Sequence, residues 1–359
     1  MRTILLAFFA VLDIPVKWEK VRGGFAFQWI GYWSCLQQIE VGISEGRRRW
    51  VVEWIKKILM GEPTIADFDS GVGRLSFVCG ALIYDKPFLA PLFSLSAATR
   101  NKYGRKVDLK NLPPFVKFIL FHLMSRLEKR AMAPCKRGRP RGNTAVERFR
   151  TDAKAEGELV TVGGYQTFHA DGTAIPHGEA KWFFLKLDRG SAPWAFARGE
   201  PFRAIASLEL LGTLLGLMLL VDEVHNSEVY FAATLSVGGL TDNNGNRFAV
   251  TKMLTTKWPL LAFLAELSMQ LEKRGVLLEV NWVPREQNTE ADAITNMDYD
   301  WLRMENKVAT VMGQLPFLIL PELLAKGEFF YNGSETVNVG APPVAKDKRS
   351  LRVKDPWDV

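Results

Sequence analysis

Residues 149–165 predict a β-hairpin, and this hairpin constrains how the whole second half of the chain can fold. The run 149–155 reads as a strand that carries Asp152. Gly157 then supplies a turn, and an antiparallel strand returns to a predicted bulge at Gly163-Gly164. An aspartate on a strand is common on protein surfaces. Asp152 alone therefore does not indicate a functional site, and the acidic residues that follow it in the chain must be considered with it.

The chain beyond the hairpin alternates strands and helices, and three more acids fall at defined places in it. Glu209 lies in the first turns of a helix, Asp242 follows a strand that ends at Thr241, and Asp292 lies in the first turn of a helix that we expect Asn288 to cap. The expected elements are strands at 181–187, 230–240 and 277–283 and helices at 205–221, 247–258, 259–274 and after 288. The order of acids is therefore strand Asp, helix Glu, strand Asp, helix Asp.

Glu209 is the one acid of an apolar helix, 205–221, whose leucines cover most of its circumference. A bare carboxylate buried in such surroundings costs several kcal/mol, so it needs a partner. The alternative explanation is a glutamate that the helix dipole favours near the N-terminus.

This order of elements and acids is similar to the ribonuclease H domain of retroelement polymerases, over about residues 147–297. The matching motifs are Thr-Asp-Ala at 151–153, Glu-Leu at 209–210, Thr-Asp-Asn at 241–243 and Asn-x-x-Ala-Asp-Ala at 288–293. The resemblance implies an α/β fold for 147–300, a ribonuclease H-like mixed five-stranded sheet flanked by helices. It also implies that the catalytic and metal-binding residues are Asp152, Glu209, Asp242 and Asp292.

Physical chemistry agrees with a metal at such a site. Carboxylates that converge within about 4–6 Å repel by roughly 4 kcal/mol per close pair at an effective dielectric near 20. Their hard oxygens suit Mg²⁺ or Mn²⁺, and two such ions can activate a water and stabilise the leaving 3′ oxygen of a phosphodiester. By resemblance, Asp152 bridges both ions, Asp292 holds the nucleophile-side ion, and the substrate is the RNA strand of an RNA–DNA hybrid, selected through its 2′-hydroxyls.

The chain departs from many relatives in one respect, the histidine shortly before the last aspartate. The corresponding stretch 281–285 is Asn-Trp-Val-Pro-Arg, and none of the chain's four histidines lies there. Slow turnover and a degenerate site both stay open. The alternative function is a catalytically decayed fragment that binds nucleic acid without cutting it, and a third is an integrase or transposase of the same fold superfamily.

Residues 1–130 predict a mainly helical domain. We expect a strand at 25–33 and helices at 47–60, from Thr64 onward, at 87–99 and at 113–129, with Ser44 and Thr64 as caps. The segments 17–20, 29–32, 42–44 and 71–77 resemble the end of a retroelement reverse transcriptase: its last palm hairpin, thumb and connection. DIRS-type retrotransposons are the relatives implied. No Tyr-x-Asp-Asp occurs, so we expect no polymerase activity from this chain alone, and an upstream polymerase part of the same element is an implied partner.

A basic linker at 131–146 is expected between the two domains. It holds four cations, Lys136, Arg137, Arg139 and Arg141, in a Pro/Gly-broken stretch. The net charge of +7 and pI near 9.2 fit a nucleic-acid partner. We therefore name these four residues, with Asn244 and Arg247, as candidate nucleic-acid contacts, while a plain charged linker stays the alternative.

The remaining features concern compartment and tail. Three widely spaced cysteines suit reduced thiols in an intracellular protein, cytoplasmic or nuclear and not secreted. The longest apolar run, 210–221, is shorter than the roughly 18 residues of a membrane span, so we expect no membrane partner. The tail, 301–359, begins helical and becomes Pro/Gly-rich and charged. We expect it to dock through Trp357 and to carry no chemistry.

Overall fold

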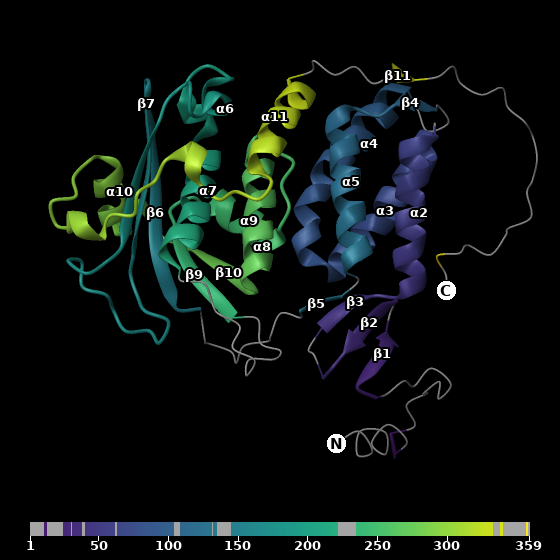
Figure 1. Cartoon of the computed structure of the whole chain (residues 1–359), viewed down its shortest axis with the longest axis horizontal. Helices are drawn as coiled ribbons and strands as arrows, with labels where there is room; N and C mark the ends of the chain where they lie inside the picture. Colours follow the sequence, from purple (N-terminus) through teal and green to yellow (C-terminus); the bar gives the residue numbers. More distant parts are fainter. Residues whose placement is uncertain are drawn as a thin grey trace, which may run out of the picture.

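The predicted hairpin forms the centre of a five-stranded sheet (Figure 1). Strands β6 (Glu147–Glu156), β7 (Leu159–Gln166) and β8 (Trp182–Leu187) pair antiparallel. Strand β9 (Leu235–Thr241) lies parallel to β6 on its other side, and β10 (Val276–Trp282) lies parallel to β9. The order β10-β9-β6-β7-β8 makes a mixed sheet.

The computed structural model of the chain describes residues 11–12, 24–29, 31–37, 40–61, 63–103, 108–130, 132–134, 145–221, 235–332, 338–339 and 357. The basic cluster of Lys136, Arg137, Arg139 and Arg141 lies outside the described residues, as does the first part of the predicted strand 230–240.

Helices cover both faces of this sheet. Figure 1 shows α10 (Thr289–Thr295) on one side of β6 and β7, and α7 (Ile205–Leu215) with α9 (Leu260–Arg274) on the other. The pairing of β6 with β7 runs without a register shift, so the predicted Gly-Gly bulge was wrong. Gly163 instead allows close helix packing, because a Cβ there would lie 2.6 Å from a side-chain carbon of Ile294 in α10.

The apolar helix is longer than its sequence suggested. A 3₁₀ turn (Pro201–Ala204) precedes α7 and a π turn (Gly216–Leu220) extends it. By length and composition alone the resulting run Pro201–Leu220 could cross a membrane, so our expectation that no such run exists was wrong. However, 67% of its most apolar 18-residue stretch is buried inside the protein, against the sheet and α9, as in the core helix of a globular domain.

The N-terminal lobe is mainly helical, as expected. Its helices are α2 (Glu45–Met60), α3 (Ile65–Ala81), the 3₁₀ helix η2 (Ile83–Phe88), α4 (Leu89–Tyr103) and α5 (Pro114–Lys129). Ser44 and Thr64 are the caps: their hydroxyls accept from the backbone N–H of Arg47 at 3.4 Å and of Asp67 at 3.1 Å.

A small antiparallel sheet adjoins these helices. Its strands are β1 (Ala26–Trp29), β2 (Tyr32–Cys35), β3 (Glu40–Ile43) and β5 (Met132–Pro134), the last of which lies within the predicted linker 131–146. The single strand predicted at 25–33 is therefore a hairpin. Gly31, with φ of +82°, turns the chain where a β strand would have to stay extended.

The two lobes share a hydrophobic core and a set of polar contacts. The Tyr84 hydroxyl of η2 donates to the Val276 carbonyl of β10 at 3.2 Å. Arg126 of α5 pairs with the buried Asp85 and, at 2.6 Å, with Glu272 of α9. Because these charges are largely withdrawn from water, their pairing fixes the orientation of one lobe against the other.

The tail reaches back over the N-terminal lobe. Helix α11 (Leu320–Tyr331) packs on α9 and α5, and β11 (Asn338–Val339) pairs with β4 (Leu109–Asn111). The Trp357 ring meets the Trp50 ring edge-on at 5.4 Å between centroids and lies 5.1 Å from the Arg47 guanidinium carbon. The predicted docking through Trp357 is thus confirmed.

The remaining short elements are α6 (Pro193–Phe196), α8 (Asn244–Lys252), η5 (Arg285–Gln287), η6 (Met304–Asn306) and η7 (Met312–Gln314). The α/β fold class, with a five-stranded mixed sheet flanked by helices and a helical region before it, is confirmed.

Candidate active site

Asp152 lies near the middle of β6, opposite Gly163 of β7, and is 7% exposed. Its Oδ2 accepts a hydrogen bond from the Thr295 hydroxyl of α10 at 2.7 Å. Burial, and then the charges of Asp242 and Asp292, raise the pKa of Asp152 to about 6, although the Thr295 bond opposes this.

Glu209 lies on α7, which packs on the face of the sheet opposite α10. Its Oε2 is buried and has no hydrogen-bond partner within the described part of the chain. Burial is the main cause that raises the pKa of Glu209 to about 8, and the charges of Asp242 and Asp152 add to it. A proton therefore occupies this carboxyl at neutral pH when no cation is bound.

Asp242 follows directly on β9, and its Oδ1 is likewise buried without a partner among the described residues. Burial and the charge of Asp292 raise the pKa of Asp242, while its own backbone N–H and Arg285 lower it. Asn243 is the N-cap of α8: its Oδ1 accepts from the Asn246 N–H at 3.1 Å, which fixes where the helix begins.

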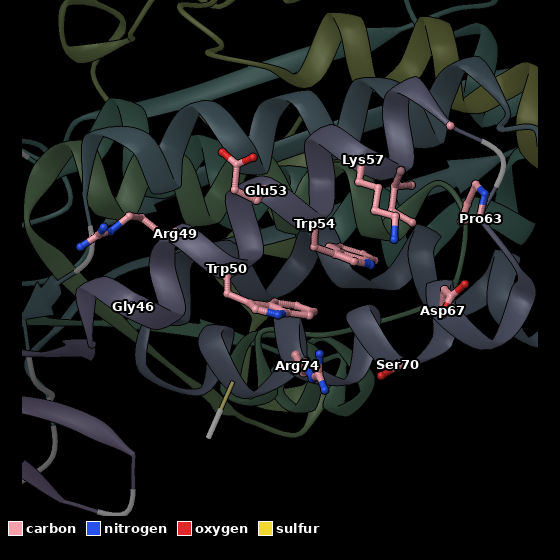
Figure 2. A pocket seen from close by; sticks show the side chains of 12 residues that line it. Gly46, Arg49, Trp50, Glu53, Trp54, Lys57, Pro63, Asp67, Ser70 and Arg74 are labelled. Atoms are coloured by element: carbon pink, nitrogen blue, oxygen red, sulfur yellow. The ribbon is translucent and has the colours of Figure 1, made fainter. Parts of the chain in front are cut away.

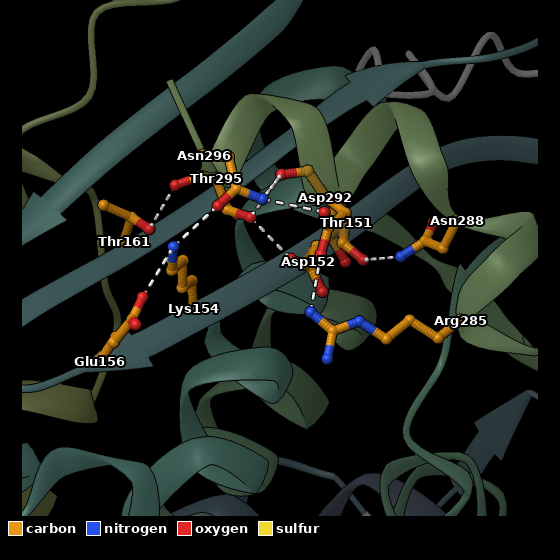
Figure 3. Close-up of polar contacts among 10 residues, drawn as sticks. All are labelled: Thr151, Asp152, Lys154, Glu156, Thr161, Arg285, Asn288, Asp292, Thr295 and Asn296. Carbon is orange, nitrogen blue, oxygen red and sulfur yellow. Dashed lines mark hydrogen bonds and ion pairs between the residues drawn. The ribbon is translucent and has the colours of Figure 1, made fainter. Parts of the chain in front are cut away.

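Asp292 lies in the first turn of α10, and its carboxylate is already engaged (Figure 3). Arg285 donates to Oδ1 at 2.9 Å, and the Asn296 side-chain amide donates to Oδ2 at 2.9 Å. Asn288 does occupy the N-cap position, but its side chain does not cap the helix. It donates instead to the Thr151 carbonyl at 3.2 Å, which ties α10 to the strand that carries Asp152.

The four predicted acids lie close enough to interact: the charges of Asp242 and Asp292 act on Asp152, those of Asp242 and Asp152 act on Glu209, and that of Asp292 acts on Asp242. Sequence reasoning missed Thr295, Asn288 and Asn296, which orient these acids, and Arg285, which opposes their charge. Their positions close to Asp292 in the chain were the available signal. Their roles depend on how α10 packs against β6.

The donor set suits a hard divalent ion, because it consists of carboxylate oxygens and two of them are buried without a partner. Within the described residues, however, no three acidic, histidine or cysteine side chains are close enough to hold one ion as they stand. The residue types therefore fit Mg²⁺ or Mn²⁺, but the side chains must move to close the ligand set.

Asn244 and Arg247, our other candidates for nucleic-acid contact, are exposed on α8 next to Asp242. A basic groove, which the sequence did not indicate and which neither of these two residues lines, lies beside α8. It consists of a cavity of about 260 Å³ lined by Asn243 and Lys252 and a neighbouring cavity of about 460 Å³ lined by Arg198 and Arg203, and both are lined by Lys257.

Comparison with known proteins gives matches to solved structures only, since no protein-family model and no curated protein matches this chain. One match is ribonuclease H1 from the halophilic archaeon Halobacterium salinarum NRC-1, with 16% identity over 42% of this chain and 96% of that one and a TM-score of 0.29. Another is the N-terminal ribonuclease H domain of a Mycobacterium tuberculosis protein, solved as a fusion with maltose binding protein. It has 19% identity over 42% of this chain and 91% of that one and a TM-score of 0.28.

Proposed function

We propose that this chain is a metal-dependent endonuclease that hydrolyses the RNA strand of RNA–DNA hybrids. The observation that carries the proposal is the proximity of Asp152, Glu209, Asp242 and Asp292, which come from four separate elements. The charges of Asp242 and Asp292 raise the pKa of Asp152, those of Asp242 and Asp152 raise the pKa of Glu209, and that of Asp292 raises the pKa of Asp242. A protein keeps such a repulsive cluster where a cation offsets it.

Asp152, Glu209, Asp242 and Asp292 are the residues that would hold Mg²⁺ or Mn²⁺. When bound, these ions supply an activated water and charge stabilisation at the phosphate. The chain's own residues prepare the site. Thr295 orients the Asp152 carboxylate, and Asn288 holds α10 against β6.

The basic groove supports a nucleic-acid substrate. It begins beside Asp242 at Asn243 and is lined farther on by Lys257, Arg203 and Arg198. Phosphates bound by these cations would bring the adjoining backbone toward the carboxylates, and release of counterions would make the binding strongly dependent on salt.

We place this activity in the C-terminal part of a DIRS-like or related retrotransposon reverse transcriptase, inside the cell. The support is the resemblance of residues 1–130 to the palm end, thumb and connection. The polymerase part would be supplied by the same element.

The decisive assay is cleavage of a labelled RNA–DNA hybrid by the full chain with Mg²⁺ or Mn²⁺, with duplex DNA as the substrate control. We expect cleavage of the RNA strand alone. Asp152→Asn should abolish it while hybrid binding persists, because the change removes a metal ligand but no phosphate-binding cation. Asp300→Asn, an exposed aspartate after α10, is the matched control and should cut normally. If folded wild-type protein leaves the hybrid intact with both ions, the proposed activity is wrong.

A second candidate function, nucleic-acid binding without cleavage, is favoured by a cavity in the N-terminal lobe. This cavity of about 690 Å³ lies between α2 and α3, and its lining, drawn in Figure 2, includes the aromatic Trp50 and Trp54, the basic Arg49, Lys57 and Arg74, and the acidic Glu53 and Asp67. The indole planes of Trp50 and Trp54 are inclined by only 6°, and the Trp54 indole N–H is buried without a partner in the described residues. Parallel rings beside cations suit stacked bases and their phosphates.

Titration of a fluorescent hybrid separates the two functions. If the protein binds nucleic acid without cleaving it, the affinity should fall steeply as the salt concentration rises and should not depend on Mg²⁺. The Trp50→Ala variant should bind more weakly than wild type. Cleavage in the hybrid assay, with binding that is unchanged in Trp50→Ala, would contradict it.

A further inference from the structure

Arg285 places a positive charge beside the four acids. It lies in η5, between β10 and α10, in the stretch where the sequence offers no histidine. Its guanidinium donates to Asp292 Oδ1 at 2.9 Å, with 76% of its side chain exposed against 32% for Asp292 (Figure 3). A side chain this exposed is held by its charge rather than by packing.

The positive charge of Arg285 acts on the whole cluster and not on Asp292 alone. The charges of Asp292, Asp152 and Asp242 all stabilise the guanidinium. It in turn favours the ionised forms of Glu209 and Asp242. The neighbouring Lys154 is engaged elsewhere, with Glu156 at 2.9 Å and Asn296 at 2.8 Å.

Within the described residues no closed set of three ligands exists, and the contact with Arg285 engages one of the four acids. One oxygen of Asp292 is directed to Arg285 and the other to Asn296. A divalent ion that binds Asp292 through Oδ1 must share that oxygen with the guanidinium or displace it, and in either case it binds with a positive charge already beside it.

We propose that Arg285 is a built-in counter-ion of the carboxylate cluster that competes with the divalent metal for Asp292. Arg285 is thus a positioning residue: it lowers the affinity of the site for metal and holds the metal-free site together. This inference rests on the proposed function, since it requires the four acids to bind a divalent ion.

Removal of the guanidinium should therefore tighten metal binding. We expect Arg285→Gln to lower the dissociation constant for Mn²⁺ about tenfold, which corresponds to about 1.4 kcal/mol. Arg285→Lys keeps the positive charge and should stay close to wild type. Arg189→Gln is the matched control, because Arg189 makes a similarly exposed pair with Glu158 at 2.8 Å that does not involve the four acids.

The test is isothermal titration calorimetry with Mn²⁺ on the full chain, without nucleic acid. Melting curves with chelator and with Mn²⁺ form a second readout. The inference predicts that Arg285→Gln melts below wild type with chelator, gains more from Mn²⁺ and binds it more tightly. Wild type that binds Mn²⁺ with the same or better affinity than folded Arg285→Gln overturns this inference and leaves the proposed function standing. Failure of both proteins to bind Mn²⁺ overturns the proposed function, and this inference with it.

Discussion

Glu209→Gln should make the metal-free protein more stable, although it alters a buried residue of the proposed active site. The folded state raises the pKa of Glu209 from its ordinary 4.5 to about 8, chiefly through burial. A raised acid pKa means that the folded state binds the proton more tightly than the unfolded chain does. The contribution of Glu209 to stability is therefore fully present below pH 4.5 and is lost as the pH rises toward and through 8.

The size of this loss follows from the two pKa values. Each pH unit between them lowers the free energy of unfolding by about 1.4 kcal/mol. The loss is under about 1 kcal/mol at pH 5 and on the order of 3 kcal/mol at pH 7. Glutamine has nearly the same shape and no charge to bury, so Glu209→Gln should escape this loss.

Glu266 of α9 provides a contrast. It is a glutamate with no exposed surface, and both of its carboxylate oxygens accept hydrogen bonds. Its carboxylate accepts from the backbone N–H groups of Leu318, Ile319 and Leu320 at 2.8–2.9 Å, where α11 begins. A glutamine offers one acceptor oxygen in place of two. Glu266→Gln should therefore lower the free energy of unfolding by about 1–3 kcal/mol at pH 7.

Urea unfolding followed by circular dichroism, with chelator at pH 5 and pH 7, measures both effects. We expect the advantage of Glu209→Gln over wild type to grow by about 1.4 kcal/mol per pH unit. A variant that is less stable than wild type at pH 7, or an advantage that does not change with pH, would refute the reasoning that Glu209 is buried at a repulsive site.

Three further predictions concern other parts of the molecule. Gly71→Ala should destabilise the protein by about 1–3 kcal/mol, because the new Cβ would lie 1.9 Å from the Trp54 ring. Gly73→Ala lies in the same helix, its Cβ would meet no atom within 4 Å, and it should stabilise the protein by about 0.5–1 kcal/mol. Equal urea midpoints for the two variants would contradict this packing. Mn²⁺ at a hundredfold excess over its dissociation constant should add about 2.7 kcal/mol to wild type, visible as a higher melting temperature, and a response of Asp152→Asn equal to wild type would count against the metal site. Lys257→Gln should reduce the slope of log affinity against log salt for a hybrid by about 1, and an unchanged slope would remove Lys257 from the phosphate-binding groove.

The sequence by itself determined much of the local structure, including the elements that carry the four acids. Ser44 and Thr64 cap their helices as expected because a cap depends on residues within one turn of each other. The strands and helices that carry Asp152, Glu209, Asp242 and Asp292 follow from hydrophobic periodicity, which is also a local property.

The tertiary structure decided everything that depends on residues far apart in the chain. The Thr295 hydroxyl meets Asp152 across 143 positions, and Asn288 leaves its expected capping role for a carbonyl 137 positions away. Arg285 lies near Asp292 in the chain, yet its charge acts on Asp152 and Asp242 only because β6, β9 and α10 meet at one place. Periodicity and propensity report on near neighbours, whereas burial, charge repulsion and the pKa values that result from them depend on which surfaces pack together.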